Sequence, residues 1–210
     1  MTTHAIQIVD LRRAPKVPVG AVLHDGVSAV QLLAAEKDWK TARYQIVFDL
    51  IKKGRPEADF PQHWRWDWAK KAPQLKLLAT HAFGIECEQQ WQGLMMTTTV
   101  AHAARIGDDK GKPLVYVKYL ESAPWNLKSF AEKPRFGAIG ARLLEAAILL
   151  SKDEGFAGRI GLHSLPNPVT EGFYQTLGLM RLGVDKAVEN LPYYEMTREN
   201  AAKFLEEAKQ

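Results

Sequence analysis

The sequence has one cysteine, Cys87, and no long apolar run. A single cysteine excludes an intramolecular disulfide and a cysteine metal cluster. None of the six histidines has a second histidine four residues away, the spacing that holds zinc on a helix, so no metal is expected. A transmembrane helix needs roughly 18 or more apolar residues, and the first twenty residues lack the pattern of a secretion signal. We therefore expect a cytoplasmic protein without a membrane partner.

Neither charge nor composition is extreme. Of 210 residues, 46% are hydrophobic and 25% are charged, which is ordinary for a globular protein with a packed core. This length predicts a single domain over residues 1–210, with an added layer at its N-terminal end. The net charge of +4 suits nucleic acid, an acidic protein or the phosphates of a cofactor, and does not distinguish between them.

Apolar periodicity predicts an α/β chain with a mixed, mostly antiparallel sheet of about seven strands flanked by helices on both faces. Val30 and Leu33 recur at helical spacing in the first predicted helix, and Gly54 follows its end. The predicted strands are residues 4–10, 78–88, 90–101, 113–121, 159–164, 179–184 and 192–197, and the predicted helices include 28–53, 139–154, 167–177 and 198–209.

A glycine-containing turn, Arg135 to Ala141, joins a strong strand to the helix over 139–154. The first N–H groups of a helix have no partner within it and lie at the positive end of the helix dipole, which suits a pyrophosphate. Gly137 and Gly140 permit close approach of the backbone, and Arg142 adds charge. Taken alone, this pattern fits a phosphate site or an ordinary junction between a loop and a helix.

The turn resembles the signature of the GNAT superfamily of acetyltransferases, [Q/R]-x-x-G-x-[G/A]. Arg135 occupies the first place and Gly140 the last, but Ala138 stands where the family has its middle glycine. Alanine fits that place if its backbone dihedral angles are helical, whereas a positive φ would count against it. We therefore treat the departure as tolerable.

Two further segments match the family in the expected order. Leu120 to Pro124 is similar to the strand end L-x-V-x-P, and Asn167 to Gly178 is similar to N-x-x-A-x-x-L-Y-x-x-x-G-F. The resemblance implies an acyl-CoA-binding core over 80–197. It leaves a divergent N-terminal part over 1–79 that borders the acceptor site, and a C-terminal helix over 198–210.

The resemblance also implies acetyl-CoA as co-substrate and a set of residues that contact it. Backbone N–H groups near Leu120 and Ser122 would stabilise the oxyanion, and Tyr174 would protonate the departing sulfur. The implied cofactor-binding residues are Leu120, Ser122, Arg135, Phe136, Gly137, Ala138, Ile139, Gly140, Ala141, Asn167, Phe173 and Tyr174. Two purely structural interpretations also stay open: Tyr174 is a helix tyrosine packed on the sheet, and Asn167 is a helix cap.

Glu121 is the preferred candidate for the general base because it ends the central strand at the predicted cleft. A glutamate at a strand end can equally be a solvated charge. Glu86, Glu88 and His163 are alternatives, although a partly buried, hydrogen-bonded histidine is the more ordinary interpretation of His163.

Two regions could shape the acceptor site. The loop from Trp125 to Pro134 is longer than in the family, and is either a surface insertion or a lid or wall of the acceptor pocket. The N-terminal part mixes aromatic and basic side chains, which can bind nucleic acid, pack on the sheet or remain solvated. Its members are Trp39, Tyr44, Trp64, Trp66, Trp68, Lys52, Lys53, Arg55, Lys70, Lys71 and Lys76.

These observations predict an N-acetyltransferase that moves an acetyl group from acetyl-CoA to a primary amine by direct attack in a ternary complex. The acceptor is a small molecule, a peptide or tRNA. A GNAT-type toxin that acetylates aminoacyl-tRNA and a CoA-binding module without turnover are the alternatives. The sequence does not distinguish acetyl from a longer acyl group, and it leaves a homodimer open.

Overall fold

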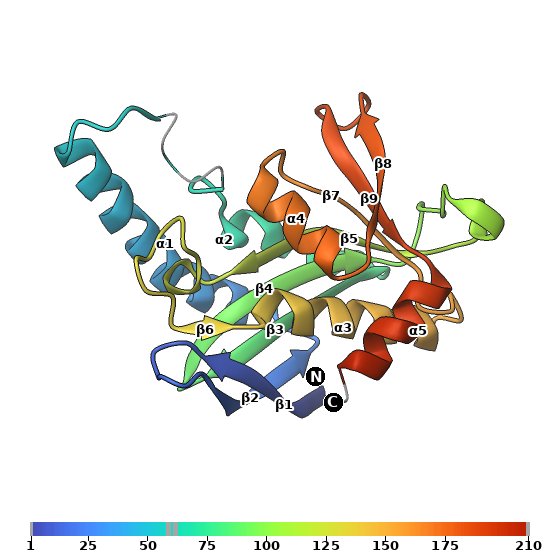
Figure 1. Cartoon of the computed structure of the whole chain (residues 1–210), viewed down its shortest axis with the longest axis horizontal. Coiled ribbons are helices and arrows are strands. Elements are labelled where there is room, and N and C mark those ends of the chain that lie inside the picture. The colour runs from blue at the N-terminus through green and yellow to red at the C-terminus, as the bar shows by residue number, and fades with distance from the viewer. Residues whose placement is uncertain (1, 58–59, 61–62, 209–210) are drawn as a thin grey trace. The chain divides into compact units, whose positions relative to one another are not determined.

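The structure is a computed structural model that describes residues 2–57, 60 and 63–208. The described residues form five α-helices and nine strands (Figure 1). The strands are β1 (Thr2–Asp10), β2 (Val17–Asp25), β3 (Thr80–Cys87), β4 (Gln90–Thr98), β5 (Val115–Ser122), β6 (Phe136–Gly137), β7 (Ile160–His163), β8 (Met180–Asp185) and β9 (Leu191–Met196). The helices are α1 (Ala29–Lys52), α2 (Trp68–Lys71), α3 (Ile139–Asp153), α4 (Pro168–Thr176) and α5 (Arg198–Glu207). Lys209, predicted to lie in the last helix, is outside the described residues.

The sheet is mixed and mostly antiparallel, which confirms the predicted fold class. Hydrogen-bonded neighbours follow the order β6-β1-β2-β3-β4-β5-β7-β9-β8, in which β5 and β7 are parallel. Two of the nine strands were not predicted. β2 follows the basic turn after β1, and its alternation of apolar and polar residues is interrupted by Pro18 and Gly20. It nevertheless pairs with β1 from Asp10↔Val17 to Thr2↔Asp25. β6 is two residues long, too short for any period to be visible.

The chain divides into two compact units, which we call the first and the second unit. The first comprises Met1–Leu94 and Glu121–Gly140, and the second comprises Met95–Leu120 and Ala141–Gln210. β4, β5 and α3 contribute residues to both. The prediction of a single domain stays a prediction, and each unit is described by itself.

In the first unit, α1 begins and ends where the sequence predicts. Ser28 caps its N-terminus in a capping box with Gln31, and Gly54 follows its end at φ +68°. The face that it buries differs from the prediction. Val30 and Leu33 are 76% and 51% exposed, whereas Leu32, Ala35 and Trp39 are buried. The pattern was misleading because the buried stripe continues through charged residues, Glu36 and Arg43.

These charged residues belong to a buried ion cluster, Glu36, Arg43, Lys71 and Glu121. The Arg43 guanidinium donates one hydrogen bond to Glu36, a second to Glu121 Oε1 at 3.0 Å and a third to the carbonyl oxygen of Trp66 at 2.8 Å. Trp68 donates its backbone N–H to Glu36 Oε2 at 2.9 Å. The cluster therefore connects α1, the start of α2 and the end of β5 within the first unit.

In the second unit, α3, α4 and α5 end or begin at the predicted signals. Gly155 and Gly178, which follow α3 and α4, have φ values of +75° and +87°. α5 lies beside α3 (Figure 1), and Arg142 Nη1 donates to the carbonyl oxygen of Ala208 at 3.4 Å. β8 and β9 form a hairpin with a register shift between Arg181 and Val184. No helix in the described part of the chain combines the length and apolar character needed to cross a bilayer.

The ion cluster predicts a large cost for removing its central cation. Arg43→Met leaves two carboxylates buried without their main partner, so the free energy of unfolding should fall by about 3–5 kcal/mol. Urea denaturation measures this change. Lys37→Met, an exposed position on the same helix, is the control and should change stability little. A small effect of Arg43→Met would show that the cluster does not hold the first unit together.

Candidate functional site

The predicted phosphate turn is fixed in the first unit by the end of β1. Asp10 is the register partner of Phe136 in the short strand β6, and Val9 is the partner of Gly137. Leu11 donates its N–H to the carbonyl oxygen of Arg135 at 2.8 Å. After β6 comes Ala138, and α3 begins at Ile139. The turn thus opens α3, as the sequence predicts, but the strand directly before it is the unpredicted β6 rather than β5.

Ala138 corrects one expectation. Its φ is +66°, so the residue is left-handed rather than helical, and the missing glycine is not neutral. A side chain in this conformation costs about 1–2 kcal/mol because Cβ crowds the following carbonyl oxygen. A left-handed residue beside right-handed ones turns successive N–H groups to the same side, which is the geometry of an anion-binding nest. The backbone of the turn is therefore strained at Ala138, and the same conformation orients its N–H groups as donors to an anion.

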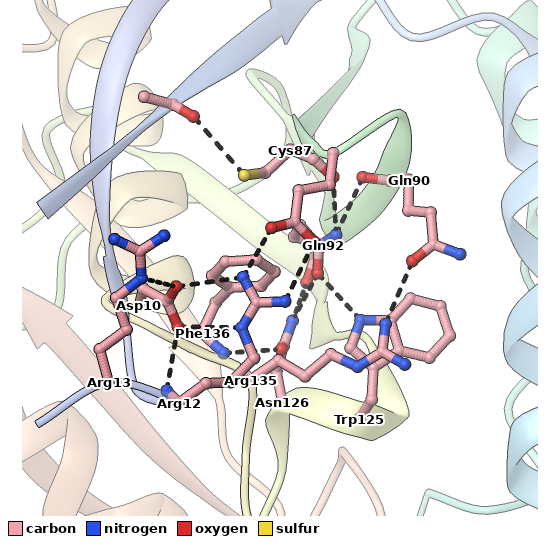
Figure 2. A network of polar contacts seen from close by, with 12 residues as sticks. Asp10, Arg12, Arg13, Cys87, Gln90, Gln92, Trp125, Asn126, Arg135 and Phe136 are labelled. Atoms are coloured by element: carbon pink, nitrogen blue, oxygen red, sulfur yellow. Dashed lines mark hydrogen bonds and ion pairs between the residues drawn. The ribbon is translucent and has the colours of Figure 1, made fainter. Parts of the chain in front are cut away.

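A buried glutamine connects this turn to β4 (Figure 2). Gln92 is fully buried, and its Oε1 accepts hydrogen bonds from Trp125 Nε1 at 2.9 Å and Asn126 Nδ2 at 3.0 Å. Its Nε2 donates to the carbonyl oxygens of Cys87 at 3.0 Å and Gln90 at 3.2 Å. The amide oxygen of Gln92 therefore binds the loop after β5, and its amide nitrogen binds the β3–β4 hairpin. This one side chain attaches the loop to the hairpin.

The same loop holds the beginning of the turn. Asn126 Oδ1 accepts the N–H of Phe136 at 3.0 Å, and the carbonyl oxygen of Trp125 accepts the N–H of Arg135 at 3.0 Å (Figure 2). These two N–H groups are consequently engaged within the protein. The first-turn N–H groups of α3 follow directly, and such groups have no partner inside their helix. The donors that suit an anion begin at Ala138.

The loop over 125–134 is attached to the first unit through the buried side chain of Phe130. Phe130 is 7% exposed, and its ring lies 5.2 Å from the ring of His63. Burial lowers the pKa of His63 to about 4, so this imidazole is neutral at physiological pH. Phe130 therefore anchors the loop to the first unit's core, and the role of the loop as a wall of an acceptor pocket stays a prediction.

Arginine side chains surround the turn. Arg135 is exposed, donates to Gln90 Oε1 at 3.3 Å and lies 5.5 Å from the Trp125 ring. Arg12 lies 4.7 Å over the ring of Phe136 and donates to Asp10 and Glu88. Hydrogen bonds from Arg12 lower the pKa of both carboxyl groups. Glu88, one alternative base, is thus paired with Arg12.

Glu121 lies in the buried ion cluster and is 3% exposed. Its Oε1 accepts from Arg43, and its Oε2 accepts from Trp68 Nε1 at 2.7 Å. Burial raises its pKa to about 7, although Arg43 and the Trp68 hydrogen bond oppose the shift. The interpretation as a solvated strand-end charge is wrong, because the carboxylate is enclosed and both of its oxygens have partners.

Tyr174 is buried in the second unit. It is 7% exposed, and its ring lies 5.3 Å from Phe173 and 5.8 Å from Tyr194. Burial raises its pKa well above the ordinary value of a tyrosine, so the hydroxyl remains protonated. The Tyr194 hydroxyl donates to Glu171 Oε2 at 2.8 Å, which attaches α4 to β9. Tyr174 can therefore act as a neutral hydrogen-bond donor.

The side chains of Asn167 and His163 are both hydrogen-bonded within the second unit. Asn167 Oδ1 accepts the N–H of Thr170 at 2.8 Å, which confirms its interpretation as the cap of α4. His163 contacts the hydroxyl of Tyr116 through Nδ1 at 2.6 Å and Asp185 through Nε2 at 3.3 Å. This confirms the interpretation of His163 as a partly buried, hydrogen-bonded histidine. Leu120 and Ser122, near the end of β5, are half-buried.

The aromatic residues of the N-terminal part divide into two groups. Trp39 and Trp68 are fully buried, so the packing interpretation of Trp68 is confirmed. Trp64 and Trp66 instead line a cavity of about 360 Å³ with polar walls. The residues that line the cavity are Glu36, Lys40, Arg43, Tyr44, Trp64, Arg65, Trp66, Asp67 and Lys70. It mixes cations, acids and aromatic surface within the first unit.

Sequence reasoning missed Gln92 and Asn126. Neither residue belongs to a motif, and a glutamine between Trp91 and Gly93 gives no sign that it is the buried centre of a hydrogen-bond network. The longer loop was the only signal, because a long segment that stays packed needs partners for its backbone groups.

No family model and no curated protein matches the sequence. Solved structures do match the fold. The PaiA N-acetyltransferase of Thermoplasma acidophilum in complex with coenzyme A is 16% identical with a TM-score of 0.53, over 83% of this chain and 98% of that one. RimJ of Mycobacterium smegmatis in complex with CoA-disulfide is 15% identical with a TM-score of 0.52, over 99% and 95%. A bacterial toxin is 15% identical with a TM-score of 0.51, over 69% and 80%.

The strain at Ala138 predicts the effect of restoring the glycine. Ala138→Gly removes the cost of the left-handed alanine but adds entropy to the unfolded chain, so the free energy of unfolding should rise by about 0.5–1 kcal/mol. Urea denaturation measures it. Ala141→Gly, at a helical position of α3, is the control with the opposite sign. A loss of stability in Ala138→Gly would contradict the left-handed conformation.

Proposed function

From the GNAT fold of this chain, the fold of known acetyltransferases, we propose that the protein is an N-acetyltransferase that uses acetyl-CoA. The observation that carries the proposal is the turn from Arg135 to Ala141, where a left-handed residue precedes the first turn of α3. The matching motifs before and after it, at Leu120–Pro124 and Asn167–Gly178, support the same activity. Because these segments belong to two compact units, the proposal that they act together relies on their order in the sequence.

The residues of the turn fit a pyrophosphate. The N–H groups from Ala138 to Ala141 are the proposed donors, since those of Arg135 and Phe136 are engaged. Arg135 adds a positive charge on an exposed side chain beside them. Gly140 is the proposed position at which the backbone approaches the ligand closely, whereas the missing side chain of Gly137 makes room for Leu11. Phe136 supports the turn by packing, because it is 1% exposed.

Acetyl-CoA supplies an activated thioester, and we assign the remaining roles to groups of the chain. Backbone N–H groups around Leu120 and Ser122 would stabilise the oxyanion that forms when the amine attacks. Tyr174 would donate its hydroxyl hydrogen bond to the departing sulfur. The ordinary pKa of a thiol, about 8.5, lies below that of the buried tyrosine, so Tyr174 would remain protonated and stabilise the departing thiolate as a hydrogen-bond donor. Asn167 and Phe173 would position α4 around the pantetheine.

Glu121 is the proposed general base. A carboxyl group with a pKa of about 7 is half ionised near neutral pH, which suits removal of a proton from an incoming ammonium. Arg43 and Trp68 hold the carboxylate in one orientation. The same contacts enclose it, so a proton would have to reach it through a water or through movement of a neighbouring side chain.

The cavity lined by Trp64 and Trp66 is the proposed entry for the acceptor. It lies in the part of the first unit that contains Glu121 and its partners, since Glu36 and Arg43 belong both to its wall and to the ion cluster. Its wall carries four basic residues and two acidic ones, which suits an acceptor that carries an anionic group beside its amine.

A toxin that acetylates aminoacyl-tRNA is the second candidate. Lys40, Arg65 and Lys70 beside two tryptophans would suit a phosphate backbone with a stacked base. A solved bacterial toxin shares the fold at 15% identity. RNA therefore remains a candidate acceptor, together with small amines and peptides.

Tyr174→Phe tests the proposed reaction. Release of the CoA thiol should depend on an added amine in the unmodified protein, and should slow by at least about 10²-fold in the variant. The dissociation constant for CoA should be unchanged, because the hydroxyl acts on the leaving sulfur. Tyr194→Phe, which also removes a buried tyrosine hydroxyl, is the control. Equal turnover in Tyr174→Phe and the unmodified protein would exclude Tyr174 as the donor.

Glu121→Gln tests the base. The rate should rise with pH through about 7 in the unmodified protein, because only the ionised carboxylate accepts a proton. The variant should lose this rise and most of its turnover at pH 7, with little change in CoA affinity. Glu36→Gln, which removes the other carboxylate paired with Arg43, should keep the pH dependence. If both variants behave alike, Glu121 has a structural role rather than a catalytic one.

A further inference from the structure

The segment between β1 and β2, residues 11–16, begins against the phosphate turn, which Leu11 and Arg12 contact. Besides the hydrogen bond from Leu11 to Arg135, the Leu11 side chain packs on Gly137, where an added Cβ would lie 3.3 Å from Leu11 Cδ2. The preceding residue, Asp10, is the register partner of Phe136. Two arginines, Arg12 and Arg13, follow at once.

The two arginines are engaged to different degrees (Figure 2). Arg12 bonds to Asp10 Oδ1 at 3.0 Å and Glu88 Oε1 at 2.6 Å, and its guanidinium lies over Phe136. Within the described part of the chain, Arg13 makes one ion pair, from Nε to Asp10 Oδ2 at 3.3 Å, and its side chain is 70% exposed. A guanidinium has five N–H donors, so Arg13 keeps most of its donors for a ligand.

The charged side chains near the turn carry an excess of positive charge. The guanidinium groups of Arg12, Arg13 and Arg135 face the carboxylates of Asp10 and Glu88, which leaves one positive charge in excess. Arg12 is shared by both carboxylates, and Arg135 is engaged with Gln90 and Trp125. Asp10 is buried, so it holds the Arg13 guanidinium in place without covering it. Arg13 is thus an anchored but accessible cation.

The chemistry of CoA matches a cation in this place. Its ribose carries a 3′-phosphate monoester one sugar ring from the pyrophosphate, and a monoester has a charge near −2 at neutral pH. Arginine binds such a group with two parallel hydrogen bonds. We propose that Arg13 binds the 3′-phosphate of CoA and selects CoA over its dephosphorylated form. The assignment rests on the proposed function, because it needs the pyrophosphate on the adjacent turn.

Calorimetry with CoA and 3′-dephospho-CoA tests the assignment without any turnover. A charged hydrogen-bonded contact corresponds to roughly a tenfold to hundredfold preference for CoA in the unmodified protein. Arg13→Gln should weaken CoA binding by about tenfold or more and leave dephospho-CoA binding unchanged. Arg13→Lys should retain part of the preference, because it keeps the charge but not the planar fork. Arg198→Gln removes another exposed arginine, 52% accessible and paired with Glu199 at the start of α5, and should change neither affinity.

The outcomes separate this assignment from the function on which it rests. Equal losses for both ligands in Arg13→Gln, or no preference for CoA in the unmodified protein, would overturn the role of Arg13 and leave the acetyltransferase proposal intact. Binding of neither ligand by the unmodified protein would overturn both. Loss of the preference in Arg13→Gln alone, with normal dephospho-CoA binding, supports the assignment.

Discussion

The Arg43 guanidinium, enclosed between two carboxylates, is the interaction on which the first unit depends. A buried charge is tolerated when its donors and acceptors are paired, and Arg43 pairs with Glu36, Glu121 and a backbone carbonyl. Because these partners come from α1, from β5 and from the segment before α2, one side chain fixes three elements. Burial of this cluster raises the pKa of Glu121 to about 7, although Arg43 opposes the shift. Folding and the proposed proton transfer therefore rest on one group of charges.

The phosphate turn is held in a comparable way. Ala138 has an unfavourable conformation, and the surrounding hydrogen bonds keep it there: Asn126 and Trp125 bind the two preceding N–H groups, and β1 pairs with β6. A turn that is rigid before a ligand arrives loses little entropy on binding. The long loop after β5 is thus a support for the proposed cofactor site, in addition to any role that it has toward the acceptor.

The fold class and most elements could be predicted, because apolar periodicity and glycine stop signals act locally. β2 and β6 could not, since one contains Pro18 and Gly20 and the other is two residues long. The buried face of α1 was misread because Glu36 and Arg43 lie on it, and only tertiary partners explain their burial. Motif order singled out the turn, which opens α3 as predicted, and Tyr174, and the roles of both stay predictions. Gln92, Asn126 and the φ of Ala138 depend on contacts between distant segments, which local patterns do not contain.

Transfer of the acetyl group tests the central claim most directly. Acetyl-CoA labelled in its acetyl group is incubated with the protein and a cell extract, and metabolites, proteins and RNA are then separated. We predict that label appears on an amine in one of these fractions with release of an equal amount of free CoA thiol, and label in RNA would identify the tRNA-modifying candidate. Tight binding of CoA with all of the label still in the thioester would contradict an acetyltransferase, and would instead identify a CoA-binding module.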